Sequence, residues 1–186
     1  KEISDIKKIM GLETNKVYKD RNDIHTNLRY GRIILLTDQD LDGVHIRGLC
    51  VNMFDSQWHQ LVRDDSFLGF MNTPILKATK GKEKCAFYNE QEFEEWKEGR
   101  NMKGWNIKYY KGLGTSTGKE FKEYFQDKKI VQFRFEEGSK DALDKVFRKN
   151  RAEDRKTGLE AYDPKKCIEM KETSISYEDF VDKELI

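Results

Sequence analysis

The sequence is short of the residues that build disulfide frameworks and zinc sites. Its 186 residues include three cysteines, Cys50, Cys85 and Cys167, and no two of them form a CxxC pair. An odd, dispersed set of cysteines indicates a reducing compartment and argues against a disulfide scaffold or a cysteine-based zinc site. The three thiols are therefore expected to be packed or surface side chains.

Long apolar runs and an excess of one charge are also absent. No apolar run approaches the roughly 20 residues that a membrane helix needs, so no membrane partner is expected. The 35 basic and 34 acidic residues leave a formal net charge of +1. Any contact with a nucleic acid must therefore come from local patches. The N-terminal residues KEISDIKKIMG have the pattern of an amphipathic helix and not that of a signal peptide.

Strand and helix patterns alternate along the chain, which is typical of an α/β sheet. The apolar run at 32–37 predicts a buried strand, and the apolar spacing over 44–62 predicts a helix. Further strands are predicted at 67–79 (broken by Pro74), 85–88 after a hairpin turn at 80–84, 105–110, 130–135 and 174–176, with helices at 2–10, 90–99, 117–127, 139–150, 152–162 and 177–185. Residues 13–30 are predicted to be an irregular loop.

Three aspartates follow the strand at 32–37, in the segment TDQDLDG. If the chain stays extended there, the side chains of Asp38, Asp40 and Asp42 point to one side. Carboxylates at such short distances repel each other, and one of them would have a raised pKa. A divalent cation removes this repulsion, and Mg²⁺ prefers carboxylate and water ligands. The three aspartates are therefore predicted to bind Mg²⁺.

Other interpretations of the aspartates compete with this one. The segment DxDxDG matches the start of an EF-hand calcium loop. However, Leu49 stands at the twelfth position, where that loop has a bidentate glutamate, and the segment follows a strand instead of a helix. An aspartate-nucleophile phosphatase would use Asp38 to attack phosphorus and Asp40 as acid and base, although that class usually has Thr or Val where Asp42 stands. A non-enzymatic scaffold, whose acids only cap the following helix, is a further alternative. The phosphatase and the scaffold stay open.

A second candidate segment is YYKGLGTSTGKE, residues 109–120. It is not a P-loop, because three residues separate Gly114 from Gly118, whereas the P-loop motif requires four between its two glycines. Its exposed amides, three hydroxyls and Lys111, at a helix N-terminus, are suited to holding a phosphodiester backbone. The alternative is a plain turn, since Thr117 and Glu120 have the spacing of a capping box. His45, in the first turn after the acids, is a further candidate for steering a phosphate.

Three segments in this order, LRYGRIILLTDQDLDGVHIRGL, FYNEQEFEEWK and YYKGLGTSTGKEFKEYF, closely resemble the TOPRIM domain of eukaryotic-type type IIA DNA topoisomerases. SISYEDFVDKELI resembles the segment that leads into that family's winged-helix domain. The resemblance covers nearly the whole chain. It implies an α/β fold with a mostly parallel, Rossmann-like sheet flanked by helices, a β-hairpin insertion and a helical C-terminal extension.

The resemblance also implies a function. Enzymes of this family are homodimers that cleave both strands of one DNA duplex, pass a second duplex through and reseal the first, using ATP bound in another domain. Asp38 and Asp40 match the metal-binding DxD of the family and Asp42 matches its third acid, with Mg²⁺ as cofactor and Mn²⁺ or Ca²⁺ as substitutes. The candidate contacts to double-stranded DNA are His45, Lys111, Gly112, Gly114, Thr115 and Ser116. A nuclear location is expected, or a cytoplasmic viral factory if the enzyme is viral.

Two residues of the family's active site have no counterpart in the sequence. One is the glutamate of an EGDSA motif, which is the other metal ligand, and the other is the nucleophilic tyrosine. Because the chain opens at Lys1 rather than Met, we expect a fragment that is inactive alone. Residues 1–130 would form the TOPRIM domain without its first acidic strand, and residues 131–186 an extension toward a winged-helix domain.

Overall fold

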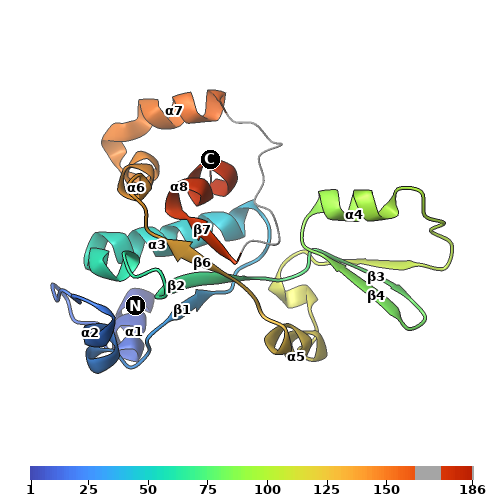
Figure 1. Ribbon diagram of the computed structural model, residues 1–186, viewed down its shortest axis with the longest axis horizontal. Coiled ribbons are helices and arrows are strands. Elements are labelled where there is room, and N and C mark those ends of the chain that lie inside the picture. Colours follow the sequence, from blue (N-terminus) through green and yellow to red (C-terminus); the bar gives the residue numbers. More distant parts are fainter. Residues whose placement is uncertain (162–172, 186) are drawn as a thin grey trace.

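The computed structural model describes residues 1–161 and 173–185, which form two β-sheets with helices around them (Figure 1). The first sheet has the strand order β1 (Ile33–Leu35), β2 (Leu68–Asn72), β6 (Lys129–Arg134) and β7 (Ser174–Ser176). The second has the order β4 (Glu83–Phe87), β3 (Leu76–Lys80) and β5 (Asn106–Tyr109). In Figure 1 the second sheet and its helix α4 (Glu90–Lys97) stand to one side of the first sheet.

The first sheet confirms the predicted α/β class. Its β1–β2 and β6–β7 pairings are parallel, and its β2–β6 pairing is antiparallel. Parallel strands need a crossover, which α3 (Leu41–Val62) provides between β1 and β2. The remaining helices are α1 (Glu2–Met10), α2 (Arg21–Asn27), α5 (Gly118–Gln126), α6 (Ser139–Phe147), α7 (Ala152–Glu160) and α8 (Tyr177–Phe180), which continues into a π-helical turn at Val181–Leu185.

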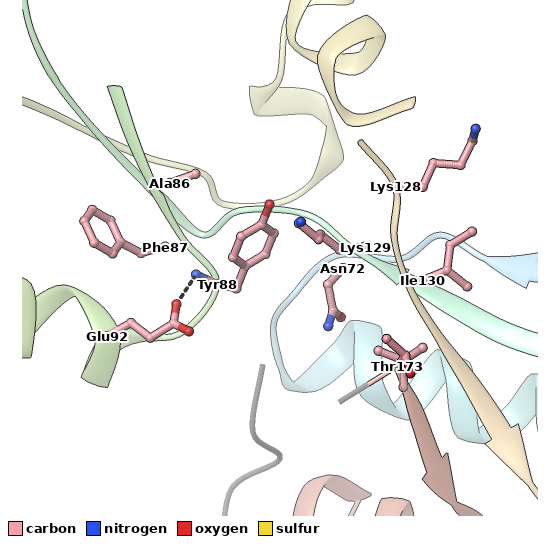
Figure 2. Close-up of a pocket in the computed structure, with 10 residues that line it drawn as sticks. Asn72, Ala86, Phe87, Tyr88, Glu92, Lys128, Lys129, Ile130 and Thr173 are labelled. Atoms are coloured by element: carbon pink, nitrogen blue, oxygen red, sulfur yellow. Dashed lines mark hydrogen bonds between the residues drawn. The ribbon is translucent and has the colours of Figure 1, made fainter. Parts of the chain in front are cut away.

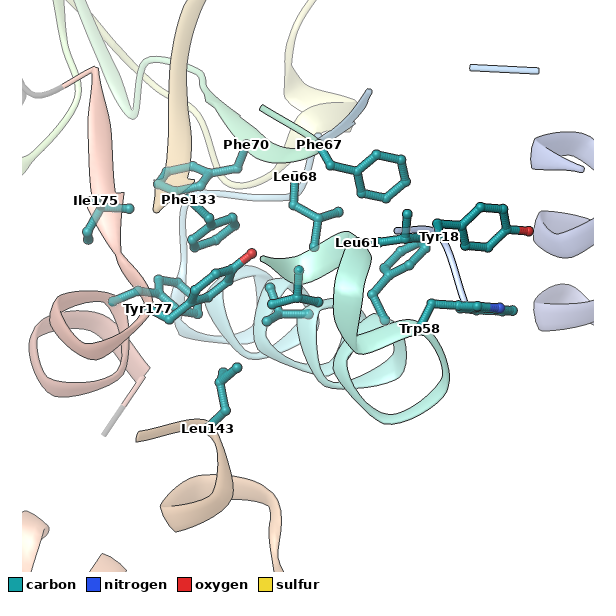
Figure 3. Packing of buried hydrophobic residues seen from close by; sticks show 14 of the residues in the cluster. Tyr18, Trp58, Leu61, Phe67, Leu68, Phe70, Phe133, Leu143, Ile175 and Tyr177 are labelled. Carbon is teal, nitrogen blue, oxygen red and sulfur yellow. The ribbon is translucent and has the colours of Figure 1, made fainter. Parts of the chain in front are cut away.

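The main hydrophobic core lies between the first sheet and the helices α3, α6 and α8 (Figure 3). Phe133 on β6 is at its centre, since its ring stacks on Tyr177 with 4.9 Å between the ring centroids. The same ring lies 5.3 Å from Phe70 on β2 and meets Phe180 edge-on at 5.1 Å. The aromatic residues of β2, β6 and α8 therefore join the two central strands of the first sheet to α8.

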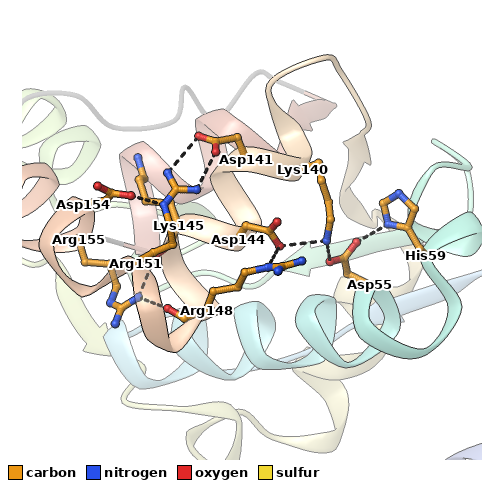
Figure 4. A network of polar contacts seen from close by, with 10 residues as sticks. All are labelled: Asp55, His59, Lys140, Asp141, Asp144, Lys145, Arg148, Arg151, Asp154 and Arg155. Carbon is orange, nitrogen blue, oxygen red and sulfur yellow. Dashed lines mark hydrogen bonds and ion pairs between the residues drawn. The ribbon is translucent and has the colours of Figure 1, made fainter.

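A polar network fastens α6 to α3 beside this core (Figure 4). Asp55 of α3, 7% exposed, accepts a hydrogen bond from Lys140 Nζ at 2.8 Å and lies 2.5 Å from His59 Nδ1. Lys140 also donates to Asp144, and Arg148 pairs with the same carboxylate at 2.8 Å. A buried carboxylate without a cation would cost several kcal/mol, so Lys140 stabilises this helix contact.

The region predicted as a loop at 13–30 contains a helix, and that part of the prediction was wrong. Helix α2 begins after Asp20, whose side chain accepts a hydrogen bond from Asp23 N. It buries one apolar side chain, Ile24, so its seven residues offer little helical periodicity to detect. The Trp58 indole donates to Glu13 O at 2.8 Å and ties this N-terminal region to α3.

The predicted strand at 67–79 belongs to two sheets. Proline cannot donate a ladder hydrogen bond, and Pro74 lies where β2 ends and β3 starts its own pairings. The predicted hairpin is confirmed, because β3 and β4 pair in antiparallel fashion around Gly81. Phe93 and Trp96 of α4 pack on Phe87 of β4.

The C-terminal elements follow the predictions with small shifts. The helix expected at 139–150 ends at Phe147, and that expected at 152–162 ends at Glu160, with Tyr162 outside the described residues. The predicted division at residue 130 falls inside β6 and stays a prediction. Among the described residues, no helix has both the length and the apolar character needed to cross a membrane.

Removing the ring at the core centre tests this account of the packing. We expect Phe133→Ala to lower the free energy of unfolding by about 3–5 kcal/mol, because it leaves a cavity between β2 and α8. Phe125→Ala is the control, since that side chain is half exposed and should change stability far less. Urea unfolding of the 186-residue chain measures both, and equal losses would contradict the assignment of the core.

Candidate metal and DNA-binding loops

The aspartate segment lies between β1 and α3, at the carboxyl end of β1. Asp40 is the N-cap of α3, and its Oδ1 accepts a hydrogen bond from Gly43 N at 2.8 Å. The helix therefore begins at Leu41, and the extended backbone that would align three aspartates ends at Asp40. Asp42 lies in the first turn of α3 and is exposed. A helix N-terminus stabilises negative charge, which suits all of these carboxylates.

Gly43 allows the helix to start directly against the strand end. A Cβ atom at this position would lie 1.9 Å from the Asp38 carbonyl oxygen and 2.7 Å from its carbonyl carbon. Because these are backbone atoms, no side-chain rotation relieves the clash. The glycine of DxDxDG therefore fixes the backbone of Asp38 against the first turn of α3, and so fixes it relative to Asp40.

The two candidate segments meet at Asp38. Leu113 N donates a hydrogen bond to Asp38 Oδ1 at 2.6 Å, across 75 positions of the sequence. Gly112 adopts φ = +94°, and a Cβ there would lie 2.8 Å from Asp38 Oδ2. This left-handed conformation favours glycine. The glycine loop, defined as residues 111–117, thus packs its backbone on the carboxylate of the aspartate segment.

The aspartates offer carboxylate oxygen atoms, the kind of ligand that Mg²⁺ takes in proteins. Within residues 1–161 and 173–185, no group of three His, Cys, Asp or Glu side chains is placed to hold one metal ion. The Oδ1 atoms of Asp38 and Asp40 each accept a hydrogen bond from a backbone amide. Within the described part of the chain, their Oδ2 atoms have no hydrogen-bond partner. Mg²⁺ is often bound by one or two carboxylates together with water and substrate phosphates. The oxygen donors present fit that pattern.

Arg47 is a buried cation that the sequence patterns did not reveal. It lies on α3, it is 2% exposed, and its Nε donates to Thr37 Oγ1 at 2.9 Å. Its Nη2 donates to Gln39 Oε1 at 3.0 Å, and its guanidinium lies 4.6 Å from the Phe70 ring centroid. Burial lowers the pKa of Arg47, and the Glu184 and Asp40 carboxylates oppose that shift. One sequence signal could have revealed it: Arg47 lies at helical spacing from Gly43 and Val51, on the face of α3 that is buried.

The predicted DNA contacts lie on the exposed parts of the two segments. Lys111, Gly114 and Thr115 are exposed, and no atom lies within 4 Å of a Cβ built on Gly114. Ser116 is half-buried, with its hydroxyl 3.3 Å from the Tyr124 hydroxyl. His45 is exposed in the first turns of α3. The glycine loop therefore presents one ammonium group, the threonine side chains of Thr115 and Thr117 and an open backbone to solvent.

The end of the glycine loop is fixed by Glu120. The predicted capping box is confirmed, because Glu120 N donates to Thr117 Oγ1 and Thr117 N donates to Glu120 Oε2. The same carboxylate accepts hydrogen bonds from the Tyr110 hydroxyl and from Lys108 Nζ. Lys77 Nζ of β3 lies 3.8 Å from it. Glu120 thus ties α5 to two strands of the second sheet.

These contacts shift the titration of both partners. Burial raises the pKa of Glu120, but the hydrogen bonds from Thr117, Tyr110 and Lys108 outweigh it and lower the pKa to about 2. Burial, followed by the hydrogen bond to the Glu120 carboxylate, raises the pKa of Tyr110 well above its ordinary value. The carboxylate therefore stays ionised, and the phenol protonated, at neutral pH.

A cavity of about 680 Å³ lies between the two sheets (Figure 2). Tyr88, Asn72 and Lys129 are among the residues that line it, and Glu92 accepts a hydrogen bond from Tyr88 N. None of the predicted site residues lines this cavity. The candidate site is therefore the surface formed by the aspartate segment and the glycine loop.

Comparison with known proteins identifies the family to which the chain belongs. The family model described as the C-terminal associated domain of TOPRIM matches residues 71–186, so the chain belongs to this family. DNA topoisomerase 2 of Plasmodium falciparum is 46% identical over 189 residues, which is all of this chain and 13% of that protein. The Arabidopsis thaliana enzyme is 45% identical and human DNA topoisomerase 2-alpha 44%, also over all of this chain and 13% of each relative.

A solved structure shares the fold over the whole chain. It is the crystal structure of the Plasmodium falciparum topoisomerase II DNA-binding, cleavage and re-ligation domain, with a TM-score of 0.91 and 44% identity. The match covers 100% of this chain and 25% of that one. The predicted relation to eukaryotic type II topoisomerases is therefore confirmed, and the chain spans about 13% of the length of the curated relatives.

The pKa of Glu120 predicts a dependence of stability on pH. Because the folded-state value lies near 2 and the ordinary value is 4.5, Glu120 stabilises the fold above pH 4.5. That contribution is lost as the pH falls through 4.5 toward 2. We expect Glu120→Gln to lower stability at pH 7 and to flatten this part of the profile.

Urea unfolding between pH 2 and 7 measures the effect. Glu123→Gln is the matched control on the same helix, because Glu123 is more exposed and makes ion pairs of 3.7 Å only. A Glu120→Gln profile that keeps the wild-type slope would show that the Glu120 contacts do not stabilise the fold.

Proposed function

We propose that this chain is the metal-binding, DNA-facing part of the cleavage core of an ATP-dependent type II DNA topoisomerase. The observation that supports it most is the hydrogen bond from Leu113 to Asp38, which unites the aspartate segment and the glycine loop. The relatives are named DNA topoisomerase 2, and the solved neighbour is titled a DNA-binding, cleavage and re-ligation domain. A site that binds metal at one loop and phosphates at the other suits DNA cleavage.

Asp38 and Asp40 would hold Mg²⁺, or Mn²⁺ or Ca²⁺ in its place. Leu113 and Gly43 fix the Asp38 side chain and backbone, and the cap of α3 orients Asp40. Asp42, two residues after Asp40 in the first turn of α3, would be the third acid of the metal site. When bound, Mg²⁺ stabilises the charge at an attacked phosphate and at the leaving 3′ oxygen.

The glycine loop would bind the backbone of double-stranded DNA. Lys111 supplies a positive charge, and the backbone at Gly112 and Gly114 has no side chain to keep a phosphate away. Thr115 and Ser116 supply hydroxyl groups, and His45 would reach a neighbouring phosphate from α3. These contacts position the DNA and carry no sequence information.

The complete enzyme would be a nuclear homodimer, or a viral enzyme in a cytoplasmic factory. It would cleave both strands through a 5′-phosphotyrosyl intermediate, pass a second duplex and religate, with the tyrosine and the ATP site in other domains. Residues 1–130 would belong to its TOPRIM domain and residues 131–186 to an extension toward a winged-helix domain. This chain alone would be inactive, because the nucleophilic tyrosine would lie in another domain.

One observation also favours the scaffold alternative. Asp40 caps α3, which a purely structural acid would do as well. The cap uses only one carboxylate oxygen, however, so capping and metal binding are compatible. Measurement of metal-dependent DNA cleavage decides between them.

We expect Asp40→Ala and Asp40→Asn to abolish Mg²⁺-dependent DNA cleavage by the complete enzyme that we propose contains this chain. Asparagine caps a helix about as well as aspartate, so Asp40→Asn removes the charge and keeps the fold. Asp20→Asn is the control, because Asp20 caps α2 through an equal 2.8 Å hydrogen bond. Its cleavage should equal wild type.

A plasmid linearisation assay with a denaturant quench measures the trapped cleavage product. Normal cleavage by folded Asp40→Asn would rule out the metal assignment and favour the scaffold. Turnover of a generic aryl phosphate that is lost in the same variant would instead support the phosphatase alternative.

A further inference from the structure

Arg47 links the aspartate segment to the C-terminal end of the described chain. Its Nη1 lies 3.6 Å from Glu184 Oε2, in the π-helical turn Val181–Leu185. That turn rests on α3 next to Arg47, since a Cβ at Gly48 would lie 2.9 Å from both terminal carbons of Leu185. The carboxylate of Glu184 is mostly buried, and burial raises its pKa against the opposing effect of Arg47. Each charge is the main ionic partner of the other.

The guanidinium reaches both neighbours of Asp38. It donates to Thr37 Oγ1 with Nε and to Gln39 Oε1 with Nη2, while Gln39 Nε2 donates to Met71 O at 3.4 Å. A guanidinium is planar and holds its donors in a fixed fork, so these two bonds restrain the loop at two points. A lysine in this place would offer one flexible ammonium group.

We propose that Arg47 is a positioning residue for the metal-binding loop and that Glu184 holds Arg47 in place. Arg47 acts through Thr37 and Gln39 and need not touch metal or DNA. The C-terminal turn thereby controls how well Asp38 and Asp40 are oriented for a divalent cation. This inference rests on the proposed function, because it assumes that these aspartates bind metal.

The test measures Mn²⁺ binding to the complete enzyme by electron paramagnetic resonance, without nucleotide and without DNA. We expect Arg47→Met to raise the dissociation constant of the aspartate site about 10- to 100-fold, as losses of groups that orient metal ligands do. Arg47→Lys should recover part of the affinity, and Glu184→Gln should weaken binding in the same direction. DNA cleavage should need more Mg²⁺ in these variants and approach the wild-type level at saturation.

Lys145→Met is the matched control. Lys145 pairs with Asp182 at 2.8 Å, so its loss loosens the same C-terminal turn without touching the loop. It should leave the Mn²⁺ dissociation constant unchanged. Thermal unfolding of each variant shows whether it is folded, and if Arg47→Met is not, Glu184→Gln and Arg47→Lys decide the question.

An unchanged dissociation constant in a folded Arg47→Met or, failing that, in Glu184→Gln would overturn the proposal. So would equal weakening by Lys145→Met, because the effect would then be a general loosening of the turn. Asp40→Asn separates this failure from that of the proposed function. If Asp40→Asn also binds Mn²⁺ normally, the aspartates are not the metal site at all.

Discussion

The close approach of α3 to the end of β1 is the constraint on which the candidate site depends. Position 43 has no room for a side chain, because a Cβ would overlap the Asp38 carbonyl group. The strand and the helix are therefore joined by a turn with almost no freedom, and the N-cap hydrogen bond of Asp40 completes it. The carboxylates proposed to bind metal are therefore held in place by backbone packing in the chain itself.

Two further contacts then orient the parts of the aspartate segment that this turn leaves free. The glycine loop reaches Asp38 from one side through Leu113. Arg47 reaches Thr37 and Gln39 from the core side, where its charge is balanced by Glu184. A buried cation is costly unless it is well paired, so these polar bonds also stabilise the packing around Arg47. Function and stability are coupled at this one side chain.

The sequence was sufficient where a pattern is local. The apolar run before TDQD and the helical spacing after Gly43 predicted β1 and α3, and the capping box of Thr117 and Glu120 predicted the start of α5. Helix α2 was missed because seven residues with one buried side chain carry almost no periodicity.

Contacts between distant segments could not be predicted in the same way. The break of the strand at 67–79 by Pro74 was predicted, but the assignment of its two halves to two different sheets arises from tertiary pairing. No spacing rule relates Leu113 to Asp38 or Glu184 to Arg47, since each pair is created by the fold. Local patterns and the resemblance to a family together supplied the candidate site residues, but the physical links among them came from the structure.

The carboxylate shared by the helix cap and the second sheet has a mechanical consequence. Glu120 is bonded at once to Thr117, at the end of the glycine loop, and to Tyr110 and Lys108, at the end of β5. Glu120 thus connects the three-stranded sheet to the glycine loop. A displacement of that sheet would therefore also move the loop backbone that contacts Asp38.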